Sequence, residues 1–143
     1  MAEVIGIPMQ KFHHEMIGPE TVVITVDAQP SFFKGDGSFR FDVVIDHHPI
    51  AEPSENAYAD IRPDYGSTCT ILTEYFLAVG QKIHRKTSTA LLYGLKTDTN
   101  NLTRNVGDAD VAMFQVLRSI ADEKPCPTPS SIQICSRSAA RAP

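Results

Sequence analysis

Two short runs of mostly apolar, β-branched residues stand out in the first third of the chain. Residues 21–26 and 41–45 are each typical of a strand buried in a parallel sheet, because such strands are almost continuously apolar. A weaker strand is predicted around residues 58–61. Apolar residues at helical spacing follow in three segments, residues 68–79, 87–95 and 108–121. The pattern predicts an α/β fold, a parallel sheet with helices on both faces.

Both strong strands run into an acidic residue with a proline close behind. Asp27 follows the first strand, and Asp46, His47 and His48 follow the second, ahead of Pro49. The carboxyl ends of parallel strands meet at one edge of the sheet, where ligands of open α/β folds gather. Taken alone, such an acid is a turn or helix cap and the histidines are surface residues. Two strands that deliver these groups to one edge favour a functional site.

Polar residues at two predicted helix ends are further candidates. Ser67 and Thr68 stand at the start of the first helix, where either hydroxyl is a natural N-cap. The free backbone N–H groups of a helix start also suit a phosphate oxygen, so capping and phosphate binding both stay open. Asp98 lies where the apolar pattern of the second helix breaks. Burying a charged acid at the end of a helix costs free energy unless another group pairs with it, so we expect Asp98 to have such a partner.

Length and composition limit the organisation of the chain. The 143 residues are enough for one domain with a core, and 42% hydrophobic with 21% charged residues is typical of a globular protein. We expect this domain to span residues 1–121. Prolines alternate with small residues from position 122, so residues 122–143 are predicted to be a linker or disordered tail.

Several classes of protein are disfavoured. No apolar run approaches the length of a membrane span and no basic leader precedes an apolar stretch, so we expect a cytoplasmic protein without a membrane partner. A net charge of −4 argues against a nucleic-acid coat protein. The three cysteines form no CxxC pair, which supports neither a disulfide framework nor a zinc ribbon.

Asp27, His47 and Asp98 are the residues that we expect around a metal ion. Mixed imidazole and carboxylate ligation suits Mn²⁺, Fe²⁺, Co²⁺ or Zn²⁺ better than Mg²⁺ or Ca²⁺. A pair of such ions would lower the pKa of a shared water and steady both oxygens of a phosphoryl transfer. His48 is expected to hydrogen-bond the phosphate or to protonate the leaving oxygen, and Asp46 to orient His47.

Four stretches together resemble the DHH phosphoesterase superfamily. Residues 44–49, Val-Ile-Asp-His-His-Pro, are similar to the motif that names it. They are joined by Val26-Asp27, by residues 66–75 from Gly-Ser-Thr onward, and by residues 91–99 with Lys-Thr-Asp-Thr at their end. These resemble the second and fourth motifs of the family and the helix between the motifs, in order and at fitting separations. The resemblance covers about residues 20–121.

The resemblance implies a site and a range of substrates. Asp27 would bridge two Mn²⁺ ions, His47 and Asp98 would bind one of them, and His48 would face the phosphate. Arg104, just past the fourth motif, is a candidate phosphate contact, with Ser67 and Thr68 as further substrate-binding candidates. The family includes RecJ-type exonucleases, oligoribonucleases, cyclic-dinucleotide phosphodiesterases, exopolyphosphatases and manganese pyrophosphatases. The expected partner is a phosphate-containing small molecule or a short oligonucleotide, with polyphosphate as an alternative.

Two parts of the family pattern are missing. Residues 1–10 lack the Asp-x-Asp cluster of its first motif, and residues after 121 resemble none of its C-terminal substrate domain. The chain therefore looks like a truncated DHH domain that would hold one Mn²⁺ ion or none. Two functions follow as expectations: a Mn²⁺-dependent phosphoesterase, or an impaired module that only binds phosphate or nucleotide. With the first strands missing, an exposed sheet edge would invite self-association.

Overall fold

The computed structural model describes residues 6, 8–33, 40–51 and 58–122. Three parallel strands form one sheet in the order β1-β2-β3, namely β1 (Ile24–Val26), β2 (Val43–Asp46) and β3 (Tyr58–Ile61). Two short 3₁₀ helices, η1 (His14–Met16) and η2 (Pro30–Phe32), flank β1. The predicted parallel sheet and α/β class are confirmed. The predicted tail lies outside the described residues, apart from Asp122.

The first strand is shorter than the apolar run that predicts it. Asp42 accepts a hydrogen bond from the backbone N–H of Val23 at 2.9 Å, and its own N–H donates to the Val23 carbonyl at 2.8 Å. A side chain therefore takes the place of a ladder partner, and regular pairing begins only at Ile24 opposite Val43. Val22, further upstream, is exposed.

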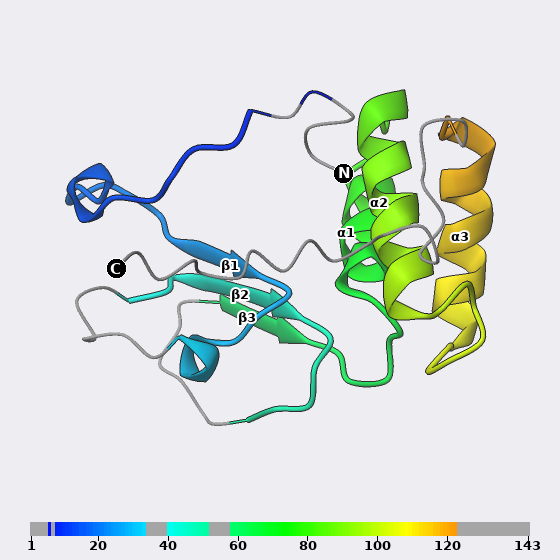
Figure 1. The fold of residues 1–143 in the computed structure, drawn as a ribbon, viewed down its shortest axis with the longest axis horizontal. Coiled ribbons are helices and arrows are strands. Elements are labelled where there is room, and N and C mark those ends of the chain that lie inside the picture. Colours follow the sequence, from blue (N-terminus) through cyan, green and yellow to red (C-terminus); the bar gives the residue numbers. More distant parts are fainter. Residues whose placement is uncertain (1–5, 7, 34–39, 52–57, 123–143) are drawn as a thin grey trace, which may run out of the picture.

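Three helices stand together beside the sheet, toward the ends to which its strands point (Figure 1). They are α1 (Thr68–Ala78), α2 (Arg85–Asp98) and α3 (Asp108–Ile120). Each packs against the other two, and α1 also contacts β2, so the described helices form one group instead of dividing between two faces. A cluster of buried side chains fills the space between them, namely Ile83, Leu91, Leu92, Leu95 and Leu117. None of the described helices is long and apolar enough to cross a membrane.

Helix α2 is longer at both ends than the apolar pattern predicts. Thr89 and Thr97 each donate the side-chain hydroxyl to the carbonyl one turn earlier, at 2.9 and 2.8 Å. These bonds satisfy the two hydroxyl groups within the helix, which runs from Arg85 to Asp98 although the apolar pattern covers only residues 87–95. Its last residue is Asp98, which the end of the helix thereby carries to the sheet.

An ion-pair network ties β3 to α1. The Arg62 guanidinium donates to both carboxylate oxygens of Asp60, at 2.8 and 2.7 Å, and to Glu74 of α1 at 2.6 Å. The Tyr75 hydroxyl also donates to Asp60. The hydrogen bonds from Arg62 hold the pKa of Asp60 below its ordinary value, although burial opposes them. The network fixes the helix that begins next to the candidate site.

β1 has one strand neighbour within the part of the chain that the structure describes. Its Ile24 and Val26 side chains are 54% and 46% exposed. This arrangement agrees with an open sheet edge, and self-association through it stays a prediction.

The contact between α1 and α2 yields a stability prediction. A Cβ atom added at Gly94 would collide with the Cys69 sulfur on α1. We expect Gly94→Ala to lower the free energy of unfolding by about 1–3 kcal/mol, because overpacking outweighs the gain in helix propensity. The double variant Gly94→Ala/Cys69→Ala should recover most of this loss. Urea unfolding of both variants is the measurement, and a double variant no more stable than Gly94→Ala would contradict the packing account.

Candidate metal centre

Parallel pairing brings the predicted site residues to one edge of the sheet. Val26 lies opposite Ile45 at the ends of β1 and β2, so the residues that follow them are neighbours. The Asp27 N–H continues the ladder by donating to the Ile45 carbonyl at 2.9 Å. Asp27 and His47 meet there, with 3.5 Å between the Asp27 Oδ1 and the His47 Nε2.

Asp27 has a left-handed backbone, with φ of 62°. Aspartate is one of the few residues other than glycine that visits this region readily. The Thr68 hydroxyl donates to the Asp27 Oδ1 at 2.9 Å. The sequence thus supplies an acid that tolerates the turn at the point where β1 must end.

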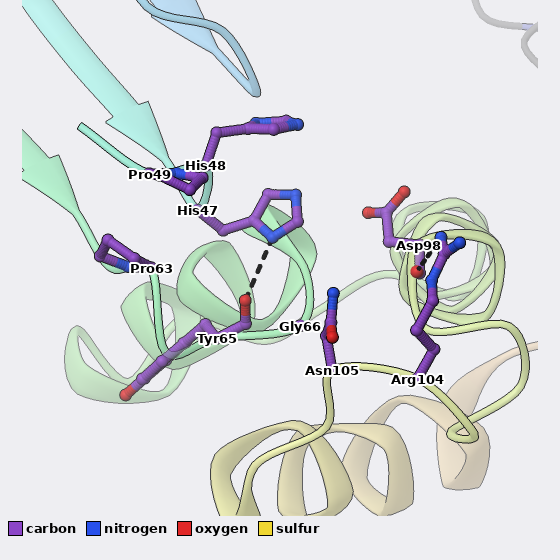
Figure 2. A pocket seen from close by; sticks show the side chains of 9 residues that line it. All are labelled: His47, His48, Pro49, Pro63, Tyr65, Gly66, Asp98, Arg104 and Asn105. Carbon is purple, nitrogen blue, oxygen red and sulfur yellow. Dashed lines mark hydrogen bonds between the residues drawn. The ribbon is translucent and has the colours of Figure 1, made fainter. Parts of the chain in front are cut away.

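The imidazole of His47 is oriented by a backbone carbonyl. Its Nδ1 lies 3.1 Å from the oxygen of Tyr65, the dashed contact in Figure 2. A carbonyl oxygen only accepts, so Nδ1 carries a proton, and in the neutral ring Nε2 keeps a lone pair. That lone pair belongs to the nitrogen nearest Asp27. This orientation leaves Nε2 as the ring nitrogen that could bind a metal ion.

Asp46 orients His48, which corrects the expectation that it orients His47. The fully buried Asp46 accepts a hydrogen bond from the His48 Nδ1 at 2.8 Å, while His47 reaches it only through its backbone N–H. Adjacent side chains at a strand end point in different directions, so one carboxylate serves one of the two rings. The Asp46 hydrogen bond raises the pKa of His48, with partial burial opposing it. Burial would raise the pKa of Asp46, but its hydrogen bonds outweigh burial and lower it.

Gln29 is a site-forming residue that the sequence analysis does not identify. Its buried amide donates to the Asp46 Oδ2 at 2.8 Å and to the carbonyls of His48 and Pro49, at 3.3 and 3.0 Å. It also accepts from the Ala51 N–H at 3.0 Å. Gln29 thus fixes both the carboxylate and the turn that carries His48. A single polar residue after a strand has no periodic signature, so the pattern could not reveal it.

Asp98 has a hydrogen-bond partner, as expected for a carboxylate at the end of a buried helix. The Ser67 hydroxyl donates to its Oδ2 at 2.6 Å. Burial raises the pKa of Asp98 overall, against the Ser67 hydrogen bond. Asp27 raises it further by charge, whereas His47 and His48 lower it. The carboxylate therefore interacts electrostatically with all three neighbouring groups.

A cavity of about 310 Å³ opens beside these residues. Figure 2 shows the His47 ring and the Asp98 carboxylate facing each other across it. Arg104 lies at the cavity and donates to the Asp98 carbonyl at 3.1 Å, so its guanidinium is held near the acid. Asn105, which the sequence analysis does not single out, extends its side chain into the same space (Figure 2).

The donor set fits a divalent cation. Ligand atoms of Asp27, His47 and His48 all lie within 4.8 Å of one another among the described residues. Two ligands at about 2.1 Å from one ion stand about 3–3.5 Å apart, which matches the contact between Asp27 and His47. Asp98 is outside this tightest group but faces it across the cavity. That this chain holds one Mn²⁺ ion or none stays a prediction.

Comparisons with known proteins give weak likenesses. No family model matches the chain. An uncharacterised protein of Methanocaldococcus jannaschii is 28% identical over 122 residues, which cover 85% of this chain and 25% of that protein. The chain thus spans about a quarter of the length of this curated relative. A crystal structure of a Methanococcus jannaschii protein, provisionally described as a family II inorganic pyrophosphatase, matches 55% of this chain and 28% of that chain, with 24% identity and a TM-score of 0.44.

The geometry predicts which residue controls metal binding. We expect His47→Ala to lower Mn²⁺ affinity by more than about 100-fold, because loss of a ligand should exceed the 10–100-fold cost of losing an outer partner. Exposed His13 is the matched control, and His13→Ala should leave the affinity unchanged. Isothermal titration calorimetry of the three proteins measures this, and equal affinity in His47→Ala and the parent would contradict the assignment.

Proposed function

We propose that this chain carries the metal centre of a phosphohydrolase that cleaves phosphate esters of small nucleotides or short oligonucleotides. The observation that supports this most is the 3.5 Å distance between the His47 Nε2 and the Asp27 Oδ1, with His47 lining an open cavity. The resemblance of the chain to DHH phosphoesterases points in the same direction.

Asp27, His47 and Asp98 would hold the ion in this account. Their mixture of imidazole and carboxylate suits Mn²⁺. The bound ion would supply an activated water and stabilise negative charge on the phosphoryl group. Burial is the main reason that the pKa of Asp98 is raised, and the negative charge of Asp27 raises it further. A cation between the two carboxylates would relieve that repulsion.

His48 is the proposed proton donor to the leaving oxygen. Its Nδ1 is occupied by Asp46, so only Nε2 is available to a ligand in the cavity. The hydrogen bond that His48 donates to Asp46 raises the pKa of His48, which favours the protonated ring. Arg104 is the proposed contact for phosphate oxygens, since a guanidinium offers several donors to a phosphate.

The size of the cavity supports a small group at the centre. At about 310 Å³ it stands at the lower end of the range for small-molecule sites. This favours one phosphoryl group with the adjoining part of its substrate, from a nucleotide, an oligonucleotide end or polyphosphate. The chain spans about a quarter of the length of the Methanocaldococcus jannaschii relative. The activity and the partners proposed here are therefore proposals for this chain alone.

Turnover with a chromogenic phosphodiester and excess Mn²⁺ tests the function. We expect His48→Gln to lower kcat by about 10²–10⁴-fold, the usual contribution of a general acid. Arg104→Met should mainly raise KM, because it removes a contact with the substrate charge. Lys82→Met, which removes an exposed charge elsewhere, is the control and should match the parent.

Two outcomes would contradict the proposal. If the parent chain binds Mn²⁺ and does not turn over the phosphodiester, pyrophosphate or polyphosphate, the chain is a binding module and not a hydrolase. If it turns over and His48→Gln retains the parent kcat, His48 is not the proton donor. A parallel titration with Mn²⁺ separates the proposed role from a ligand role, since loss of a ligand would lower metal affinity as well.

A further inference from the structure

Two adjacent hydroxyl groups at the start of α1 each hold a different carboxylate of the metal centre. Ser67 donates to Asp98 at 2.6 Å, and Thr68 donates to Asp27 at 2.9 Å. Asp27 follows β1 and Asp98 ends α2, so the two acids come from distant parts of the chain. The first residues of one helix thereby connect both.

The direction of these hydrogen bonds follows from the surroundings. The Ser67 hydroxyl oxygen accepts from the Cys69 N–H at 3.1 Å, which caps the helix, so its proton is left for Asp98. Both side chains are buried, at 0% and 2% exposure for Ser67 and Thr68. Carboxylates also gain from the positive end of the helix dipole at this place.

The start of α1 is held in place by hydrogen bonds to a residue of α3. Asp110 of α3 is fully buried and accepts from the backbone N–H groups of Gly66 and Gly107, at 2.9 and 2.8 Å, and from the hydroxyl of Thr70. Gly66 has no room for a side chain, since a Cβ there would press against the backbone of Asn105 and against Thr99. The two hydroxyls are therefore presented from a rigid support.

We propose that Ser67 and Thr68 are positioning residues that set the separation of Asp27 and Asp98 for a divalent cation. This rests on the metal centre of the proposed function. It assigns the two hydroxyls to the ligands and not to the substrate, because each proton is already directed at a carboxylate and each side chain is closed to solvent. Partners of this kind orient metal ligands, and their loss typically costs 10–100-fold in affinity.

Thr68 offers the sharper test, because Ser67 also caps the helix. Thr68→Val removes the hydroxyl at nearly constant shape, and Thr68→Ser restores it. Thr73→Val is the matched control, since Thr73 is a buried threonine of the same helix whose hydroxyl donates only to the Cys69 carbonyl among the described contacts, at 2.6 Å. Should Thr68→Val fail to fold, as judged by circular dichroism and urea unfolding, Thr68→Ala takes its place.

The measurement is the affinity of each full chain for Mn²⁺ alone, by calorimetry. We expect Thr68→Val to bind about 10–100-fold more weakly than the parent, with Thr68→Ser and Thr73→Val close to the parent. Equal affinity in Thr68→Val and the parent would overturn the inference while leaving the metal centre intact, and a raised KM for the phosphodiester in that variant would assign the hydroxyl to the substrate. A parent chain that binds no Mn²⁺ would instead overturn the proposed function, and this inference with it.

Discussion

The parallel pairing of β1 with β2 is the constraint on which the candidate site depends. Val26 lies opposite Ile45 at the ends of the two strands. The next residues, Asp27 on one strand and Asp46–His48 on the other, therefore lie at the same edge of the sheet. A shift of one residue in this register would send alternate side chains to the opposite face and separate the acid from the imidazole. The hydrogen bond from the Asp27 N–H to the Ile45 carbonyl extends the pairing to the last residue before the site.

Each side chain at that edge is fixed by a second group. A backbone carbonyl at Tyr65 determines which nitrogen of His47 is free, and the Asp46–Gln29 pair does the same for His48. Such partners limit the freedom of a ligand before an ion arrives, so less ordering remains to be done on binding. The buried polar groups near the sheet therefore mainly orient the two imidazole rings.

The sequence predicts the fold where the signal is local. Continuous β-branched runs identify β1 and β2, and apolar spacing identifies α1 and α3 to within about two residues, which is the usual uncertainty of helix ends. The start of β1 differs because the Asp42 side chain takes a ladder position there. Helix α2 continues beyond its apolar pattern through polar residues such as Lys96 and Thr97, which carry no apolar signal.

The sequence predicts the candidate site residues but not the groups that form hydrogen bonds with them. Strand ends and the resemblance together select Asp27, His47 and Asp98. In the structure His47 and Asp98 line one cavity, and Asp27 lies 3.5 Å from His47. The partner of Asp46 is not predictable, because the choice between two adjacent imidazoles depends on the turn after β2. The role of Gln29 is not predictable for a related reason, because its hydrogen bonds are made with residues 17 to 22 positions away in the sequence.

In the proposed function, Asp27, His47 and Asp98 together hold one divalent cation. Anomalous diffraction at the manganese edge, from crystals of the chain grown with Mn²⁺, tests it most directly. The account predicts a peak about 2.2 Å from the Asp27 carboxylate and from the His47 Nε2, with Asp98 turned toward it. A bound manganese at other residues, or an Asp27–His47 contact with no peak at saturating Mn²⁺, would contradict it.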